Sequence, residues 1–332
     1  MKKLLSLALA LIMVLTLSVA VAAEDPADMT QVTIDVTYTA TNTGTTSPAE
    51  TFSFSVVKTS VSDAAAGVTT DDMPDIAVGG VAFAEGEAAQ GGTMVKPMTI
   101  TLPPVDDFPS VGIYTYTIQP QAGTTAGVAY YTEDIRLVIT VIETADGQRR
   151  IAAIHTESGQ PGDTEKSNDI EYTYSAGSLD VKKVVTGNLG DRAKDFNVTV
   201  TFTAPEAGVV NSTISYIVDG ETKTIAPAEW KENTASVQIA LHHEETVTFT
   251  NIPYGVTYTV EEDADSAAGY EVSYTDNQNG TIDAASDTVI VTNTKGTTVD
   301  TGVVLDSLPY VLLIAVALVG VVAFTAKKRT ID

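Results

Sequence analysis

Short stretches in which apolar and polar residues alternate dominate the interior of this chain. This alternation has the period of a β-strand with one buried face, and helical periodicity is nearly absent. Asp146-Gly147, Asp219-Gly220 and Asn279-Gly280 favour tight hairpin turns. The predicted strands include QVTIDVTY, TFSFSVV, GIYTYTI, IRLVITVI and RIAAIH, then LDVKKVV, FNVTVTF, SVQIAL, TVTFT, VTYTV and TVIVTN. We therefore expect an all-β protein built from β-sandwiches.

The predicted strands recur in a similar order in two halves of the chain. The matched pairs are 32–38 with 179–185, 52–56 with 196–200, 116–120 with 258–262, and 169–174 with 289–294. Between the halves, TYSAGS at 173–178 has no strand pattern. We predict two tandem immunoglobulin-like β-sandwich domains, residues 25–175 and 177–296, with their boundary at this segment.

Both ends of the chain carry features of export and anchoring. Two lysines, an apolar run and small residues open the sequence, which predicts a signal peptide over residues 1–23. An uncleaved N-terminal anchor is the alternative interpretation. Near the other end, the apolar run 308–326 precedes Lys327, Lys328 and Arg329. Such a run can span a bilayer with its basic cluster on the cytoplasmic side, so we expect a transmembrane segment there.

The composition narrows the class of protein further. The chain has 18 Lys and Arg residues against 43 Asp and Glu residues, and its formal net charge is −25. Because nucleic-acid phosphates attract cationic surfaces, we expect no nucleic-acid partner. The chain contains no cysteine, so disulfides cannot stabilise this exported protein. Any covalent cross-link must therefore use other side chains.

Three polar side chains interrupt apolar strand faces in the second half of the chain. Lys183 lies on the apolar face of LDVKKVV, Glu262 on that of VTYTVEE, and Asn293 on that of TVIVTN. A buried lysine is unfavourable unless it is paired or neutral. One such residue can be an ordinary buried polar group, but a basic, an acidic and an amide side chain together indicate a buried cluster. We predict that these three side chains touch.

Two interpretations of this trio fit the pattern. In the first, burial favours a neutral Lys183 amine, which is a nucleophile. A Glu262 carboxyl group that stays protonated in an apolar site polarises the Asn293 carbonyl. The amine then attacks, ammonia leaves, and an isopeptide bond joins two strands without an external enzyme. In the second, Lys183 and Glu262 form a buried ion pair beside a hydrogen-bonded Asn293, and no bond forms.

The corresponding positions of the first domain hold Val36, Pro120 and Tyr172, none of which can form such a bond. Loss of a single member would leave buried polar groups unpaired, whereas joint loss fits a domain held by ordinary packing. The pattern gives no support for a different cross-link through Lys58 or Lys96. We therefore expect the isopeptide trio to be absent from the first domain.

The chain resembles the isopeptide-containing backbone pilins of Gram-positive bacteria over nearly its whole length. The resemblance rests on SAGSLDVKKVVTGNLGDRAKDFNVTVTF, NIPYGVTYTVEED, VIVTNTKG and the C-terminal tail. It implies that Lys183 and Asn293 form an isopeptide bond and that Glu262 catalyses its formation. The first domain of this family usually carries a second trio, and this sequence departs from the family there.

The tail, residues 298–332, is similar to a sortase sorting signal, with a short motif, an apolar span and a basic end. TVDTG stands where the usual motif is L-P-x-T-G, and it keeps Thr301 and Gly302 but lacks leucine and proline. The resemblance implies cleavage between Thr301 and Gly302 and transfer of Thr301 to an amine. In pilins that amine belongs to a lysine of the next subunit, and Lys166 stands in the matching place. A plain transmembrane anchor and a routine surface lysine are the alternatives.

The implied protein is a structural subunit of a pilus, located in the cell wall and on the surface of a Gram-positive bacterium. The C-terminal segment would anchor it in the membrane only transiently. Its partners would be sortase, other copies of the chain in a covalent polymer, peptidoglycan and a host surface ligand. The alternative is a monomeric wall-anchored adhesin that binds a host protein or glycan. We expect no metal, no cofactor and no enzymatic activity beyond the autocatalytic cross-link.

Overall fold

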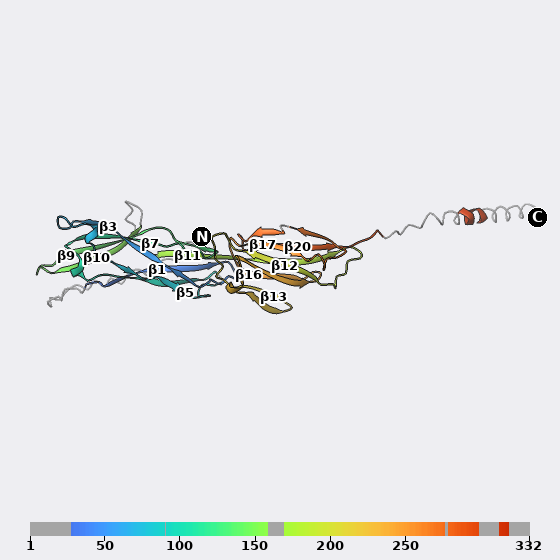
Figure 1. The fold of residues 1–332 in the computed structure, drawn as a ribbon, viewed down its shortest axis with the longest axis horizontal. Helices are drawn as coiled ribbons and strands as arrows, with labels where there is room; N and C mark the ends of the chain where they lie inside the picture. The colour runs from blue at the N-terminus through green and yellow to red at the C-terminus, as the bar shows by residue number, and fades with distance from the viewer. Residues whose placement is uncertain (1–27, 90, 159–168, 276–277, 299–311, 319–332) are drawn as a thin grey trace, which may run out of the picture. The chain divides into compact units, whose positions relative to one another are not determined.

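The computed structural model describes residues 28–89, 91–158, 169–275, 278–298 and 312–318, and its ribbon is shown in Figure 1. The chain forms two compact units. Among the described residues, unit 1 contains those up to Ala176 together with Glu206–Thr213, and unit 2 contains Gly177–Pro205 and those from Ile214 onward. Secondary structure in both units is almost entirely β-strand, as the alternating pattern predicts.

Unit 1 contains two main sheets and a small strand pair. The first sheet consists of β4 (Ala77–Val78), β6 (Thr93–Thr101), β1 (Gln31–Thr41), β11 (Asp169–Thr186) and β8 (Val128–Ala129). The second consists of β10 (Arg149–Ser158), β9 (Ile135–Glu143), β7 (Gly112–Pro120) and β3 (Phe54–Ser62). The pair is β2 (Glu50–Phe52) with β5 (Val81–Phe83), and two short 3-10 helices are η1 (Thr70–Asp72) and η2 (Val105–Asp107).

Strand alternation creates the core of unit 1. Along β1, Ile34, Val36, Tyr38 and Ala40 are buried while the residues between them are more exposed. Their neighbours in the core come from both main sheets, so the apolar faces of the two sheets meet as in a β-sandwich. The hydrophobic effect on these inward faces drives the pairing of the two layers.

Unit 2 is also built from two sheets. One contains the second half of β11, β20 (Ser286–Thr294), β18 (Glu271–Thr275), β16 (Thr246–Pro253), β13 (Ile214–Val218) and β14 (Glu221–Ile225). The other contains β15 (Thr234–Leu241), β12 (Phe196–Thr203), β17 (Thr257–Glu262) and β19 (Asn279–Thr281), and one 3-10 helix is η3 (Pro227–Glu229). Figure 1 labels β12, β16, β17 and β20 in this unit.

The turn signals have mixed outcomes. Asp219 and Gly220 join β13 to β14 with φ angles of 54° and 76°, which a tight hairpin of this kind requires. Asn279-Gly280, however, does not form a hairpin turn, because it lies inside β19 and pairs with β17. A Cβ on Gly280 would lie 2.4 Å from the hydroxyl of Tyr258. This glycine therefore allows a close approach rather than a turn.

The change of unit falls within 173–178 as predicted, but the expectation that this segment is not a strand is wrong, because β11 runs through it without interruption. Its first half pairs in parallel with β1 as far as Ser175, and from Ser178 onward it pairs in parallel with β20. A Cβ on Gly177 would lie 2.2 Å from the backbone oxygen of Ala284, so the small residues there permit close packing. The change of unit at Ala176 thus occurs within a strand, and no linker separates the units.

One segment belongs to a different unit from the one that its sequence position suggests. Glu206–Thr213 lies between β12 and β13 of unit 2, yet it packs in unit 1. The Val209 backbone N–H donates to the Thr124 oxygen at 2.8 Å, and the Asn211 side chain donates to the Thr125 hydroxyl at 2.9 Å. The structural units therefore differ here from the predicted domain 177–296.

Candidate functional site: a buried Lys–Glu–Asn trio

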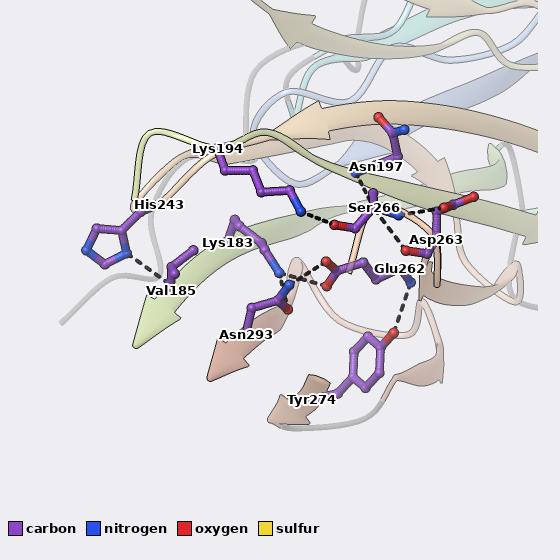
Figure 2. A network of polar contacts seen from close by, with 10 residues as sticks. All are labelled: Lys183, Val185, Lys194, Asn197, His243, Glu262, Asp263, Ser266, Tyr274 and Asn293. Atoms are coloured by element: carbon purple, nitrogen blue, oxygen red, sulfur yellow. Dashed lines mark hydrogen bonds and ion pairs between the residues drawn. The ribbon is translucent and has the colours of Figure 1, made fainter. Parts of the chain in front are cut away.

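Three strands of unit 2 bring together the three polar side chains that interrupt apolar faces. Lys183 lies on β11, Glu262 ends β17 and Asn293 is the penultimate residue of β20. Because β11 and β20 are parallel neighbours, Lys183 pairs with Val291 and Asn293 with Val185. Glu262 reaches the same point from the opposite sheet. Figure 2 shows the three side chains converging.

The polar atoms of the trio form a closed set of hydrogen bonds. The Lys183 Nζ donates to Glu262 Oε2 at 2.7 Å and to Asn293 Oδ1 at 2.5 Å. The Asn293 Nδ2 donates to Glu262 Oε1 at 2.6 Å. Each side chain therefore contacts both of the others, as the dashed lines in Figure 2 show. This contact satisfies polar groups that would otherwise be unpaired in an apolar core.

The trio is shielded from water. The Lys183 and Glu262 side chains and the whole of Asn293 are each 0% exposed. The Phe196 ring centroid lies 4.5 Å from the Lys183 Nζ and covers it on another side. Burial lowers the pKa of the Lys183 ammonium, and the hydrogen bond and charge of Glu262 oppose this effect. Compared with a free lysine, Lys183 thus loses its proton more easily to give the neutral amine, which is the reactive form.

The position of Glu262 differs from the expectation that it polarises the Asn293 carbonyl. Its two carboxyl oxygens contact the two nitrogens, while the carbonyl oxygen Oδ1 accepts from the lysine. The Lys183 amine donates to Oδ1, and the amide nitrogen of Asn293 faces the Glu262 carboxyl group. In this arrangement the carboxyl group can accept a proton from one nitrogen and return one to the other.

Neighbouring residues hold the three strands in place, and the sequence pattern does not indicate them. The Glu262 backbone N–H donates to the Tyr274 hydroxyl at 2.9 Å, and the Val185 N–H donates to His243 Nδ1 at 3.0 Å (Figure 2). The Lys183 backbone exchanges hydrogen bonds with Glu244 and Glu245. These contacts come from β18 and from the turn between β15 and β16, and strand periodicity carries no signal for such side-chain and backbone partners.

Strand register bears on the corresponding positions in unit 1. Lys183 pairs with Val291, two residues before Asn293, and Val36 likewise pairs with Ile170, two residues before Tyr172. In the other sheet, Glu262 pairs with Val198 and Pro120 with Phe54. This register is compatible with Val36, Pro120 and Tyr172 as the counterparts of the trio, but it holds equally for Tyr38 with Tyr174, because Tyr38 pairs with Tyr172.

Aromatic side chains pack closely around Tyr172 in unit 1. The Tyr172 ring stacks on Phe52 with centroids 3.6 Å apart and an interplanar angle of 9°. Tyr38 contacts both Phe52 and Phe83 edge-on, at 5.2 and 5.3 Å. Such contacts contribute dispersion and apolar burial but create no covalent tie between strands.

Several predicted features lie outside the described residues. These are the signal peptide 1–23, the acceptor candidate Lys166, and the cleavage pair Thr301 and Gly302. Of the predicted membrane segment 308–326, the structure describes 312–318, which is helical and exposed. Within the part of the chain that is described, no helix has the length and apolar character needed to cross a membrane.

Comparison with known families gives a match for each half of the chain. Residues 24–174 match the Spy0128-like isopeptide containing domain, and residues 177–295 match a domain of unknown function, DUF7601. The isopeptide-domain model thus matches the half in which we predict that the trio is absent. The trio of this chain lies in the half that matches the domain of unknown function.

Similar proteins are pilins of one organism. A pilin of Streptococcus pyogenes serotype M1 is 29% identical over 241 residues, which are 67% of this chain and 69% of that protein. The solved major pilin T3.2 of S. pyogenes has a TM-score of 0.52 at 19% identity, covering 80% of this chain and 99% of its own. Another solved S. pyogenes major pilin has a TM-score of 0.52 at 20% identity, covering 82% and 100%. The two structures show a common fold.

The fold and the site define a class: tandem β-sandwich proteins with a buried Lys–Glu–Asn trio. The comparisons support a more particular placement. A Spy0128-like isopeptide containing domain matches residues 24–174, and the relative and solved structures compared above are pilins of Streptococcus pyogenes. The chain is thus similar to Gram-positive backbone pilins.

Proposed function

We propose that this chain is a structural subunit of a cell-surface pilus, stabilised internally by an isopeptide bond between Lys183 and Asn293. The observation that carries the proposal is the contact of a fully buried lysine amine, 2.5 Å from the Asn293 carbonyl oxygen, with a buried carboxyl group bridging both residues. A subunit exposed to tension gains from a covalent tie between strands, and the lack of cysteine excludes a disulfide.

The proposed reaction balances without any external reagent. The neutral Nζ of Lys183 attacks Cγ of Asn293, and a new C–N bond forms. The nitrogen loses a proton to Glu262 Oε2, and Glu262 Oε1 delivers a proton to the departing Nδ2, which leaves as ammonia. The carboxyl group ends the cycle as it began. Proximity in the folded core supplies the rate.

The polymer is proposed to form through the tail. Sortase cleaves between Thr301 and Gly302, and the Thr301 carbonyl passes to the Lys166 amine of the next copy or to peptidoglycan. The membrane segment 308–326 holds the chain until this transfer. A role as a pilus subunit agrees with the pilin relative. The excess of acidic residues gives the chain a negative net charge, which repels other negatively charged molecules.

Intact-mass measurement of the processed chain, residues 24–301, tests the cross-link. Formation of one bond expels one ammonia, so the mass should be about 17 Da below that of the sequence. Asn293→Ala and Glu262→Gln should each abolish this deficit. Asn197→Ala and Lys182→Met serve as matched controls, since Asn197 is exposed and Lys182 pairs with Glu244 outside the trio, and both should retain it. A wild-type chain of full mass would refute the proposed bond.

A further inference from the structure

The Glu262 carboxyl group contacts two side chains that belong to the facing sheet. Glu262 ends β17, whereas Lys183 and Asn293 lie on β11 and β20 of the other sheet of unit 2. Pairing with Val198 of β12 fixes Glu262 within its own sheet. It does not fix the distance from Glu262 to the facing sheet, and apolar packing between the two layers has no direction of its own. A directional contact between the sheets at this point would therefore set the geometry of the trio.

Tyr274 of β18 makes such a contact. It pairs with Val291 of β20 across antiparallel strands, so its side chain lies on the same face of the sheet as those of Val291 and Asn293. Its hydroxyl oxygen accepts the Glu262 backbone N–H at 2.9 Å, as Figure 2 shows. A side chain from the sheet that carries Lys183 and Asn293 thus holds the backbone of the residue that carries the carboxyl group.

The hydroxyl of Tyr274 stands where a strand carbonyl would otherwise be. Within the described part of the chain, β19 pairs with β17 only as far as Thr259, and the Val260 N–H donates to the Gln278 oxygen at 2.9 Å. N–H groups two residues apart point to the same edge of a strand, so the Glu262 N–H points to this edge as well. It lies beyond the last residue that pairs with β19, and Tyr274 supplies the acceptor that the strand does not.

We propose that Tyr274 is a positioning residue for the cross-linking reaction; this inference rests on the proposed isopeptide bond. By accepting the Glu262 N–H, it holds the end of β17 where the carboxyl group contacts Lys183 Nζ at 2.7 Å and Asn293 Nδ2 at 2.6 Å. Without the hydroxyl the N–H loses its partner, and the strand end moves to find another acceptor or water. Because a misplacement of about 1 Å can lower a rate about 10²-fold, this movement should slow the proton transfers that Glu262 performs.

Tyr274 acts here as a neutral acceptor and takes no part in the proton transfers. Burial raises the pKa of its hydroxyl group, the hydrogen bond from the Glu262 backbone opposes this rise, and the charges of Glu262 and Glu261 add to it. The hydroxyl therefore stays protonated at neutral pH. Loss of the hydroxyl alone is the informative change, and Tyr274→Phe makes it while the ring is retained.

Time-resolved intact mass of the newly made chain, residues 24–301, tests the positioning role. Cell-free synthesis is stopped, samples are denatured in acid at intervals, and the fraction with the deficit of about 17 Da gives the rate of bond formation. Tyr274→Phe should form the bond roughly 10- to 100-fold more slowly than the wild type, or retain unreacted chain where the wild type is already complete. Tyr270→Phe is the matched control, because the Tyr270 hydroxyl likewise accepts a backbone N–H, that of Asp191 at 3.0 Å, and it should keep the wild-type rate.

Brief proteolysis of parallel samples measures how much of each chain is folded. A tyrosine with a merely structural role would lower the folded fraction but leave the rate within folded molecules unchanged. Slow bond formation in a fully folded Tyr274→Phe chain would therefore support the positioning role. Equal rates in Tyr274→Phe and the wild type, equal slowing in Tyr270→Phe, or slowing that only follows the loss of folded chain would each overturn it while leaving the bond intact. A wild type that never shows the deficit would instead refute the proposed bond, and the positioning role with it.

Discussion

The cross-link should account for a large part of the stability of unit 2, and Lys183→Met removes it with little change in side-chain length. The proposed bond closes a loop of 110 residues. The chain-entropy relation for cross-links assigns such a loop about 5 kcal/mol of stabilisation at 25 °C, through restriction of the unfolded chain. If the free energy of unfolding falls by about 2 kcal/mol per molar urea, this loss lowers the urea concentration at the unfolding midpoint by roughly 2–3 M.

The single tryptophan of the chain makes the measurement specific. Trp230 belongs to unit 2, and its Nε1 is buried, so its fluorescence should report the unfolding of this unit alone. Urea titrations of the wild type and of Lys183→Met, each with its mass verified, give the difference in free energy of unfolding. Lys182→Met is the matched control, because this neighbouring lysine pairs with Glu244 on the surface. The control should change the midpoint little.

The single variant leaves the Glu262 carboxyl group buried without its lysine, which destabilises unit 2 further. The double variant Lys183→Met/Glu262→Leu removes that charge as well. Its free energy of unfolding should therefore lie closer to about 5 kcal/mol below that of the wild type. An unchanged midpoint in the double variant, alongside a wild type that carries the 17 Da deficit, would refute the reasoning from loop closure.

Two further predictions concern proton binding and assembly. In Asn293→Ala the lysine amine stays free, and burial lowers its folded-state pKa. The unfolded chain then binds more protons between that pKa and about 10.4, so the free energy of unfolding should rise with pH across this window. In the wild type the Lys183 nitrogen is part of an amide, so the free energy of unfolding should not rise in this way. If urea titrations at several pH values give the same dependence on pH for both proteins, the prediction is wrong. Cells that express the chain with its sortase should yield SDS-resistant multimers. Thr301→Ala and Lys166→Arg should each reduce them to a monomer, whereas a ladder that persists in Lys166→Arg would exclude this acceptor.

The sequence by itself determined which side chains face inward. Alternation with a period of two assigns each residue of a strand to one face, so Lys183, Glu262 and Asn293 stand out as polar residues on apolar faces. It also predicted an all-β chain in two parts. These features depend on local periodicity and composition, which are visible without any knowledge of strand partners.

Only the tertiary structure decided which strands are neighbours and in what register. The parallel pairing of β11 with β20 sets Asn293 beside Val185, and the opposite sheet brings in Glu262 so that its oxygens contact the two nitrogens. The passage of β11 through the unit boundary and the strand at Asn279-Gly280 contradict local signals. Local turn and linker propensities contribute little free energy. Long-range hydrogen bonding and burial in a complete sheet contribute more and therefore decide the structure at these positions.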